Sequence, residues 1–285
     1  MSLQDKSILM DITLHSFATT RTDIRVTGEV LQNKSAQGDS GRWVTKLLPK
    51  EATQPISQID GQIRKLHRQQ TLPWSDKGAR ILPSANFDNY MSKIRSLRRQ
   101  REELVEAFRR TYPVYLNAAQ KKLGALFNPD NYPSASEASE MFEFQINATP
   151  VPHENDFRIQ LNSPTDLSNI QKDLSQQIKA AEQNAVVDLF QRIAEPLARM
   201  AERLSDPEAK FKNTLVTNIE EITNLIPSLN VTGNPRLNDL HNTIKSQLTH
   251  YTPDALRNSP ADRSAAASKA QSILSQAQAW MSPSH

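Results

Sequence analysis

Four consecutive residues copy the surroundings of a serine-protease nucleophile: Gly38, Asp39, Ser40 and Gly41. Such a serine needs a base held at its hydroxyl and backbone donors for the oxyanion, in enzymes built on a Gly-rich β-barrel. This chain has only 7 Gly in 285 residues, and it has no matching histidine segment. The motif therefore indicates a polar loop rather than a nucleophile.

Two carboxylates suggest metal chemistry. Asp130 and Glu143 resemble the acidic pair of a metal-dependent nuclease, in which a lysine stands beside the metal. Gln145 occupies the position of that lysine, and residues 128–133, Asn-Pro-Asp-Asn-Tyr-Pro, have the composition of a turn. The histidines are scattered, without a second ligand at metal-binding spacing. We therefore expect no catalytic residue, no metal and no cofactor, and we interpret the protein as non-enzymatic.

Other classes of site are limited by composition. The chain has no cysteine, which excludes disulfides, thiolate metal sites and cysteine nucleophiles. It has neither a Gly-Lys-Ser/Thr phosphate loop nor a dinucleotide-binding fingerprint. No stretch approaches the roughly 18 apolar residues of a membrane span, and residues 1–10 lack the pattern of a secretion signal. We therefore expect an intracellular protein with no membrane contact.

The strongest physical signal is charge segregation. Residues 61–125 carry a net charge of +9, whereas 1–60 are neutral and 126–285 carry −6. Such asymmetry favours an anionic partner or electrostatic contact between copies. The candidate nucleic-acid-binding residues lie on two predicted helices and are Arg64, Lys65, Arg68, Lys93, Arg95, Arg98, Arg99, Arg109 and Arg110.

Two interpretations of this basic region stay open. A stripe of this kind binds phosphates, and Trp74, Tyr90 or Tyr112 would stack on bases. However, Glu102 and Glu106 share the same side of the helix. We favour the second interpretation, a solvated face paired with the acidic C-terminal helices, because charged helix faces are usually solvated or paired.

The elements that position these residues differ between the two halves of the chain. Alternating apolar residues predict strands at 10–14, 142–146 and 157–161, and 43–48 has the pattern of a short extended segment. We expect the strands at 142–146 and 157–161 to form an antiparallel pair, with the strand near Ile12 as a candidate third member. The segment at 22–31 is ambiguous between strand and helix.

Helices and a loop complete the N-terminal half. Helical spacing predicts helices over 55–70 and 87–112, with Pro113 as a kink or restart and Gly124 as a stop. Residues 71–83 contain two prolines and a glycine, and they predict an ordered loop pinned by Trp74. Ser134 begins a capping box and should start a short helix.

The C-terminal half is predicted to be helical throughout. Apolar residues at spacings of three and four predict one long amphipathic helix over 166–204, with Pro196 as a possible kink. Five pairs of a capping residue and a proline predict helix starts, and these are Ser163-Pro164, Asp206-Pro207, Asn234-Pro235, Thr252-Pro253 and Ser259-Pro260. The long helix is the predicted interaction spine. The candidate contact residues are Leu174, Ile178, Leu189, Ile193 and Trp74.

The predicted fold class is α+β, mainly helical. Residues 1–162 would form a domain with a small antiparallel sheet and the basic helices. Residues 163–285 would form a helical domain, an extended bundle.

Several phrases of the sequence together resemble a family of uncharacterised phage, plasmid and integrative-element proteins, known only as a domain of unknown function. The phrases are Gly41–Pro49, Thr71–Pro83, Leu123–Phe127 with Asn131–Pro133, and Pro150–Arg158. The similarity covers about residues 8–200. Genes of this family often lie beside those of a MoxR-type AAA ATPase and a von Willebrand A-domain protein. The resemblance implies a mobile-element origin, the cytoplasm of a bacterial host cell and an ATPase partner. It brings no catalytic residues.

Three functions follow as hypotheses. The first is a phage or mobile-element interaction protein that forms homo-oligomers, acts as adaptor to a MoxR-type AAA ATPase, or does both. The alternative is a DNA-binding or single-stranded-DNA-binding protein that acts through residues 61–122. An enzyme with an unrecognised site is the third possibility.

Overall fold

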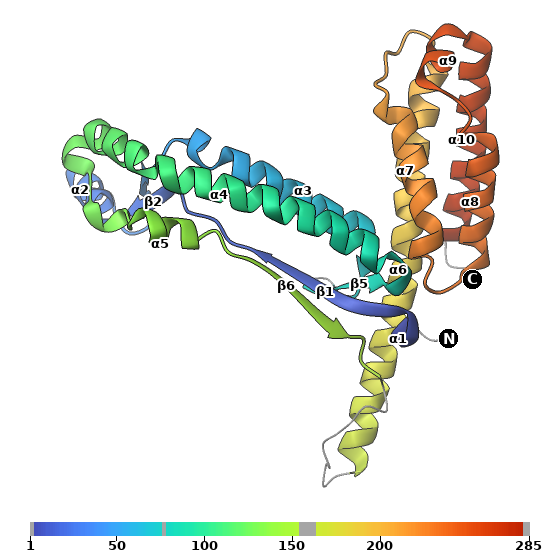
Figure 1. The fold of residues 1–285 in the computed structure, drawn as a ribbon, viewed down its shortest axis with the longest axis horizontal. Helices are drawn as coiled ribbons and strands as arrows, with labels where there is room; N and C mark the ends of the chain where they lie inside the picture. Colours follow the sequence, from blue (N-terminus) through green and yellow to red (C-terminus); the bar gives the residue numbers. More distant parts are fainter. Residues whose placement is uncertain (1–2, 76–77, 154–163, 282–285) are drawn as a thin grey trace. The chain divides into compact units, whose positions relative to one another are not determined.

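The computed structural model describes residues 3–75, 78–153 and 164–281 and is mainly helical with small antiparallel sheets (Figure 1). The predicted α+β, mainly helical class is confirmed. The chain forms two compact units, a large unit (1–11, 68–89 and 147–285) and a small unit (12–67 and 90–146). The boundary predicted at residue 162 lies outside the described residues, so the division at that point stays a prediction.

The larger sheet has the strand order β4-β5-β1-β6. Its strands are β1 (Ser7–Leu14), β4 (Leu72–Pro73), β5 (Arg80–Pro83) and β6 (Phe144–Pro150). Strand β5 is antiparallel to both β1 and β4, and Ile81 lies opposite both Leu9 and Leu72. The strand expected near Ile12 is therefore present and borders β6. The strand predicted at 157–161 lies outside the described residues.

The loop predicted at 71–83 is wrong in part, because β4 and β5 occupy both of its ends. Leu72, Ile81 and Leu82 are fully buried there, and this burial holds the segment in extended form. Pro73 and Pro83 each end a strand, where a missing N–H interrupts least of the ladder. Two prolines in a short segment therefore did not exclude regular structure.

The large unit is dominated by helices. Its helices are α1 (Leu3–Lys6), α6 (Pro164–Ser205), α7 (Thr214–Leu229), α8 (Pro235–Gln247), α9 (Pro253–Asn258) and α10 (Pro260–Met281), with a 3₁₀ turn η2 (Ser84–Asn86). The single long helix expected over 166–204 is present, and it runs through Pro196 without a break. It packs against α10 and α7, and the fully buried Ile193 and Leu197 lie in the core that these helices share.

The pairs of capping residue and proline begin helices at four of the five predicted positions. Asn234 accepts from Arg236 N–H at 2.9 Å, Thr252 from Ala255 N–H at 3.2 Å, and Ser259 from Asp262 N–H at 3.2 Å. The start predicted at Asp206 is wrong, because a turn follows it and α7 begins only at Thr214. Helix α6 begins at Pro164, as the pair Ser163-Pro164 predicts, and Ser163 itself lies outside the described residues.

The small unit contains a second, two-stranded sheet. Its elements include β2 (Thr20–Asp23), α2 (Ile24–Asn33), β3 (Trp43–Lys46), α5 (Ala135–Glu140) and the 3₁₀ turns η1 (Lys50–Ala52), η3 (Gly124–Leu126) and η4 (Pro129–Asn131). Helices α3 (Gln54–Gln70) and α4 (Phe87–Leu123) contribute residues to both units. The extended segment expected at 43–48 corresponds to β3, and the capping box at Ser134 is present.

An aromatic cluster forms the core of the small unit. Phe108 lies edge-on to Phe142 with ring centroids 5.0 Å apart, and Tyr112 and Phe17 pack beside them. Phe108 and Tyr112 belong to α4, and burial of their rings just before Pro113 offsets the roughly 3 kcal/mol that a proline costs inside a helix. Helix α4 continues through Pro113, so the predicted restart there is wrong. The helix ends at Leu123, as predicted, before Gly124, which has φ +52°.

Candidate interaction surfaces

The basic run contains one buried arginine with a structural role. Arg101 donates from Nε to Asp60 Oδ1 at 2.6 Å, from Nη1 to Phe142 O at 2.7 Å and from Nη2 to His15 O at 2.8 Å. The side chains of Arg101 and Asp60 are 3% and 4% exposed. This contact joins α4 to α3 and to two further segments of the small unit, so Arg101 serves the fold and offers no charge to a ligand.

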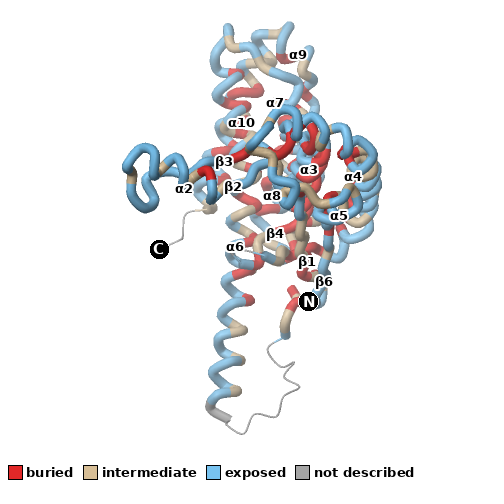
Figure 2. Tube along the Cα trace, turned by 90° about the vertical axis from the view of Figure 1, so that its left-hand side faces the viewer, coloured by how far each residue is buried: buried red, intermediate tan, exposed pale blue. Residues whose placement is uncertain are grey.

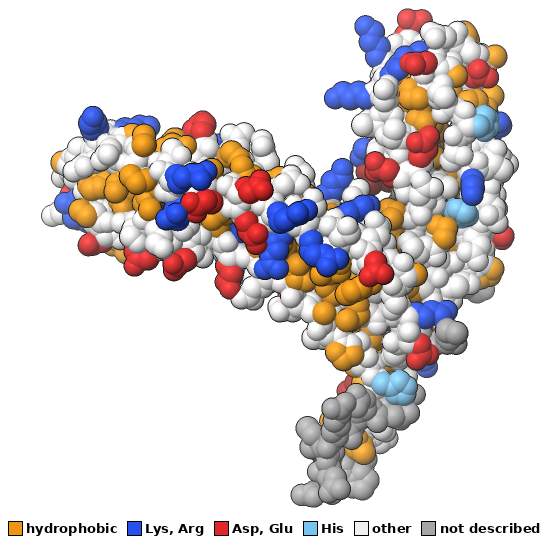
Figure 3. Space-filling model, in the orientation of Figure 1, with side chains coloured by type: hydrophobic (Ala, Val, Ile, Leu, Met, Phe, Trp, Pro, Cys, Tyr) orange, Lys and Arg blue, Asp and Glu red, His pale blue; other side chains and the backbone are white. Residues whose placement is uncertain are grey.

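The nine candidate nucleic-acid-binding residues are exposed. Arg98 pairs with Glu102 at 3.4 Å and stacks over the ring of Phe144, while Arg109 makes a two-pronged pair with Glu106 at 2.7 and 2.8 Å. This pair lowers the pKa of the Glu106 carboxyl through the hydrogen bond from Arg109. Figure 3 shows acidic and basic side chains interspersed along α4. The face is therefore of mixed charge.

The aromatic residues expected to stack on bases are wrong for that role. Tyr90, Tyr112 and Trp74 are 0%, 1% and 8% exposed. Tyr90 OH lies 2.9 Å from His67 Nδ1, and burial raises the pKa of the Tyr90 phenol. Each ring is held inside the chain by packing, so none can stack on a base.

The candidate contact residues of the long helix lie in the chain's own core. Ile178, Leu189 and Ile193 are buried, Leu174 is partly buried against them, and Trp74 belongs to the same cluster. From Ile178 to Leu204 the apolar stripe of α6 is buried in the core of the large unit and is unavailable to a partner while that unit is folded, whereas Ile170 in the first turns of the helix is 43% exposed. These buried residues therefore cannot serve as the predicted interaction spine. The sequence does not reveal this, because a regular apolar stripe has the same pattern whether the same chain or a partner covers it.

A cluster of two arginines joins α6 to the end of α3 in the large unit. Arg192 pairs with Asp188 at 2.6 Å and donates to Gln69 O at 3.2 Å and to Thr71 O at 2.8 Å. Arg80 donates to Thr71 Oγ1 at 2.8 Å and to its carbonyl. Burial lowers the pKa of both guanidinium groups. The cluster supplies hydrogen-bond donors to the backbone carbonyls where α3 passes into β4, and its role is structural.

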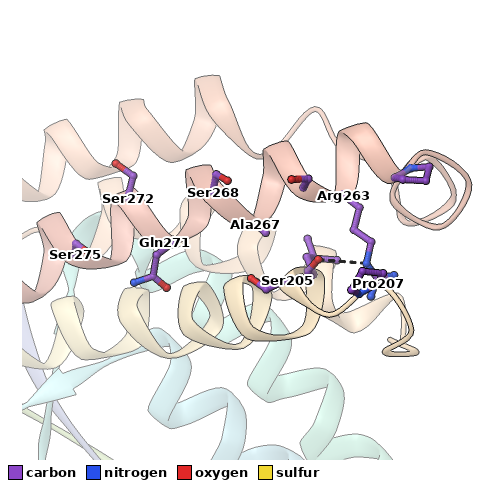
Figure 4. Close-up of a pocket in the computed structure, with 11 residues that line it drawn as sticks. Ser205, Pro207, Arg263, Ala267, Ser268, Gln271, Ser272 and Ser275 are labelled. Carbon is purple, nitrogen blue, oxygen red and sulfur yellow. Dashed lines mark hydrogen bonds between the residues drawn. The ribbon is translucent and has the colours of Figure 1, made fainter.

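A cavity of about 630 Å³ lies between the end of α6 and α10. Figure 4 shows Ser205 and Gln271 between the two helices and Arg263 at the end of the cavity. Arg263 donates to the carbonyls of Arg203, Asp206 and Ala209, and so caps the end of α6. Its guanidinium is therefore already engaged, and the remaining lining is largely serine.

The arm, residues 20–46 of the small unit, holds the densest group of exposed apolar side chains. It consists of β2, α2 and β3, and α2 is mostly exposed (pale blue in Figure 2). Ile24 is 83% exposed, Val30 42%, Trp43 43% and Val44 47%. Consecutive strand residues point to opposite faces, so exposure of both Trp43 and Val44 leaves neither face of the ribbon covered there.

Strand β3 also has an open edge. Leu47 N–H donates to Thr19 O at 2.8 Å. In an antiparallel pair, successive residues direct their backbone groups alternately toward and away from the partner strand, so this bond identifies which residues of β3 face β2. Thr45 therefore directs its backbone groups toward β2, whereas Val44 and Lys46 direct theirs outward. Sheet β2-β3 contains two strands in the described part of the chain, so this outer edge has no strand partner there.

The polar motifs do not assemble a reaction centre among the described residues. Ser40 Oγ donates to Gln37 O at 2.5 Å, within an exposed turn of the arm. Asp130 lies in η4, where its N–H donates to Asn128 Oδ1, and Glu143 accepts a hydrogen bond from Gln145. No group of three His, Asp or Glu residues in residues 3–75, 78–153 and 164–281 is arranged to hold a metal ion.

Among the described helices, none combines the length and the apolar character that a bilayer crossing requires. No protein-family model, curated protein or solved structure matches this chain.

Proposed function

We propose that this chain is a non-enzymatic interaction protein that self-associates through the arm. One observation carries the proposal: Trp43 and Val44 are exposed on opposite faces of a strand whose outer edge has no partner in the described residues. Burying large apolar side chains contributes about 1.5–3 kcal/mol each. An open edge adds backbone hydrogen bonds, because it accepts another strand.

A second copy of the chain suits this edge. A two-fold axis places the same strand of two copies side by side in opposite directions, which is the antiparallel arrangement. The whole arm carries a small net charge of +2, from Arg21, Arg25, Lys34, Arg42 and Lys46 against Asp23, Glu29 and Asp39. An interface of like surfaces therefore avoids strong self-repulsion. Little apolar surface is buried inside the arm, where Val26 is the buried aliphatic side chain. A partner that covers the arm would therefore stabilise it.

The identity of a further partner comes from the family resemblance. A MoxR-type AAA ATPase is the partner to test, in a phage or mobile-element system of the bacterial cytoplasm. An adaptor that self-associates would present several copies of one surface to the ATPase, and this multivalency raises the apparent affinity without new contacts. Binding of the ATPase by the Val44→Lys variant would separate the adaptor role from self-association.

The experiment is size-exclusion chromatography with light scattering at tens of micromolar protein, a concentration at which a weak dimer is populated. We expect a dimer for the unchanged chain and a monomer for Val44→Lys, because a buried unpaired ammonium is costly. Val114→Lys is the matched control, because Val114 is 64% exposed on α4. It should remain dimeric. A monomeric unchanged chain would overturn the proposal.

Nucleic-acid binding is the second candidate. Arg64, Lys65, Lys93, Arg99 and Arg110 are exposed, and no described carboxylate lies within ion-pair distance of them. Against this candidate stand the glutamates on α4 and the burial of the expected stacking aromatics.

Fluorescence anisotropy with labelled single-stranded DNA tests this candidate. Changing Lys93, Arg95 and Arg99 to Glu should abolish binding that weakens steeply with salt. The same charge change at Lys172, Lys179 and Arg199, which are exposed on α6, is the control. Equal loss in both triple variants would assign the binding to net charge alone and reject this surface.

A further inference from the structure

A cavity of about 590 Å³ lies in the small unit where β3 leads into η1 and the last turns of α4 pass by. Its floor is apolar: Leu47, Leu48 and Ala119 line it and are 5%, 3% and 6% exposed. Leu47 and Leu48 also belong to the core of the small unit. Pockets for small ligands occupy about 300–1,000 Å³ and are mostly apolar, so the size and the floor suit a small molecule.

The rim of this cavity is cationic. Lys46, Lys50 and Lys122 line it and are exposed, against one carboxylate, that of Glu51. The described part of the chain holds no carboxylate within ion-pair distance of these three ammonium groups. Three like charges close together repel one another, and an anion between them relieves that repulsion.

The floor is formed before any ligand arrives. Leu47 N–H and Leu48 N–H both donate to Thr19 O, at 2.8 and 3.3 Å. Tyr132 OH donates to Leu47 O at 3.0 Å and fixes the same segment from the other side. A ligand that enters therefore orders only the lysine side chains, which keeps the entropic cost of binding low.

We propose that this cavity binds a small amphipathic carboxylate, with its apolar body on the floor of Leu47, Leu48 and Ala119 and its head between the lysines. Both halves of the ligand are needed. Exposed lysines alone hold a free carboxylate weakly, because water screens the pair. An apolar floor alone gives no preference for charge. The site shares Thr20 and Lys46 with the arm, so its test is repeated in a variant that does not self-associate.

Decanoate, below its micelle concentration, is the probe for a backbone-amide NMR titration of the full chain. We expect saturable shifts at the amides of Leu47, Leu48 and Ala119, with a Kd below about 1 mM. Acetate has the head without the body, and decyltrimethylammonium has the body with the opposite charge. Each should bind at least about tenfold more weakly. Equal binding of the cation, or no saturable shift with decanoate, would overturn the proposal.

Variants locate the binding on the rim. The double change Lys50→Glu and Lys122→Glu should weaken decanoate binding about tenfold or more, because it replaces two attractions with repulsions. The control is Lys121→Glu, which reverses one charge at the exposed residue of α4 just before Lys122, outside the lining, and it should bind normally. Unchanged binding in the double variant would reject the site.

A filling variant tests the cavity itself. Ala118→Trp places a large ring in the cavity from an exposed position that the core does not need, and it should abolish binding while the amide spectrum stays folded. Repeating the titration in Val44→Lys keeps the result separate from self-association. Unimpaired binding by the folded Ala118→Trp variant would show that decanoate binds elsewhere.

Discussion

Arg101 of α4 and Asp60 of α3 form an ion pair with Nε and Oδ1 2.6 Å apart, and both side chains are almost wholly buried. The two remaining guanidinium nitrogens donate to the carbonyls of Phe142 and His15. One side chain thus ties together four segments that are far apart in the sequence. The pair is satisfied in every direction, so its removal should be felt throughout the small unit.

Arg101→Met should lower the free energy of unfolding by about 3–5 kcal/mol, because Asp60 is left buried without a partner. Urea unfolding followed by circular dichroism measures this loss.

The double variant, Asp60→Leu with Arg101→Met, should recover much of that stability, since no uncompensated charge remains. A double variant as unstable as Arg101→Met alone would show that the carbonyl contacts of Arg101, rather than the ion pair, carry the effect.

Two tyrosines of α4 should respond oppositely to loss of the hydroxyl. The buried Tyr112 OH has no hydrogen-bond partner in the described structure, whereas Tyr90 OH lies 2.9 Å from His67 Nδ1. Tyr112→Phe should therefore raise the free energy of unfolding by up to about 1 kcal/mol, and Tyr90→Phe should lower it by about 1 kcal/mol. Thermal or urea unfolding of the pair gives the comparison. Destabilisation by both changes would contradict it.

The buried phenol of Tyr112 predicts that the protein loses stability at alkaline pH. Burial raises the pKa of Tyr112 from 10.0 to about 12. Because the folded-state pKa is the higher one, the contribution of Tyr112 is complete below pH 10 and is lost as the pH rises toward 12. Tyr112→Phe should therefore lose less stability over this interval than the unchanged chain does. Identical pH profiles would remove Tyr112 as the cause.

Arg192→Lys should destabilise the large unit. The flat guanidinium reaches Gln69 O, Thr71 O and Asp188 together, and one ammonium cannot reproduce that fork. We expect a loss of about 2–3 kcal/mol in the free energy of unfolding.

Hydrogen exchange should also become faster at the amides where α3 passes into β4. Arg199→Lys on the same helix is the control, because its pair with Glu195 is exposed. Equal effects of the two substitutions would show that the contacts of Arg192 are not special.

Local signals in the sequence predict where helices and strands lie better than they predict which of their side chains are exposed. The capping residues at Asn234, Thr252 and Ser259 act within one turn, so their role is visible without tertiary structure. Asp206 carries the same signal and accepts from Glu208 N–H at 2.9 Å, yet only a turn follows it and α7 begins at Thr214. Residues 71–83 became strands through burial of Leu72 and Ile81, which depends on partners distant in the sequence.

The surfaces were harder to predict than the elements. The apolar stripe of α6 and the aromatic rings near the basic helices have the residue types of binding sites, but the fold buries most of them. The sequence does not predict the arm, because residues 22–31 have both strand and helix character; they form the end of β2 followed by α2. The exposure of Trp43 and Val44 depends on which elements pack over them, and the order of residues in the sequence does not show this.

Cross-linking through a single cysteine tests the self-association of the arm most directly. The chain has no cysteine, so Val44→Cys carries one thiol, at the open edge of β3. The account predicts that a short bis-maleimide converts this variant to a covalent dimer at micromolar concentration, while Val114→Cys stays monomeric. A Val44→Cys chain that is fully modified yet monomeric, or equal cross-linking of the two variants, would contradict it.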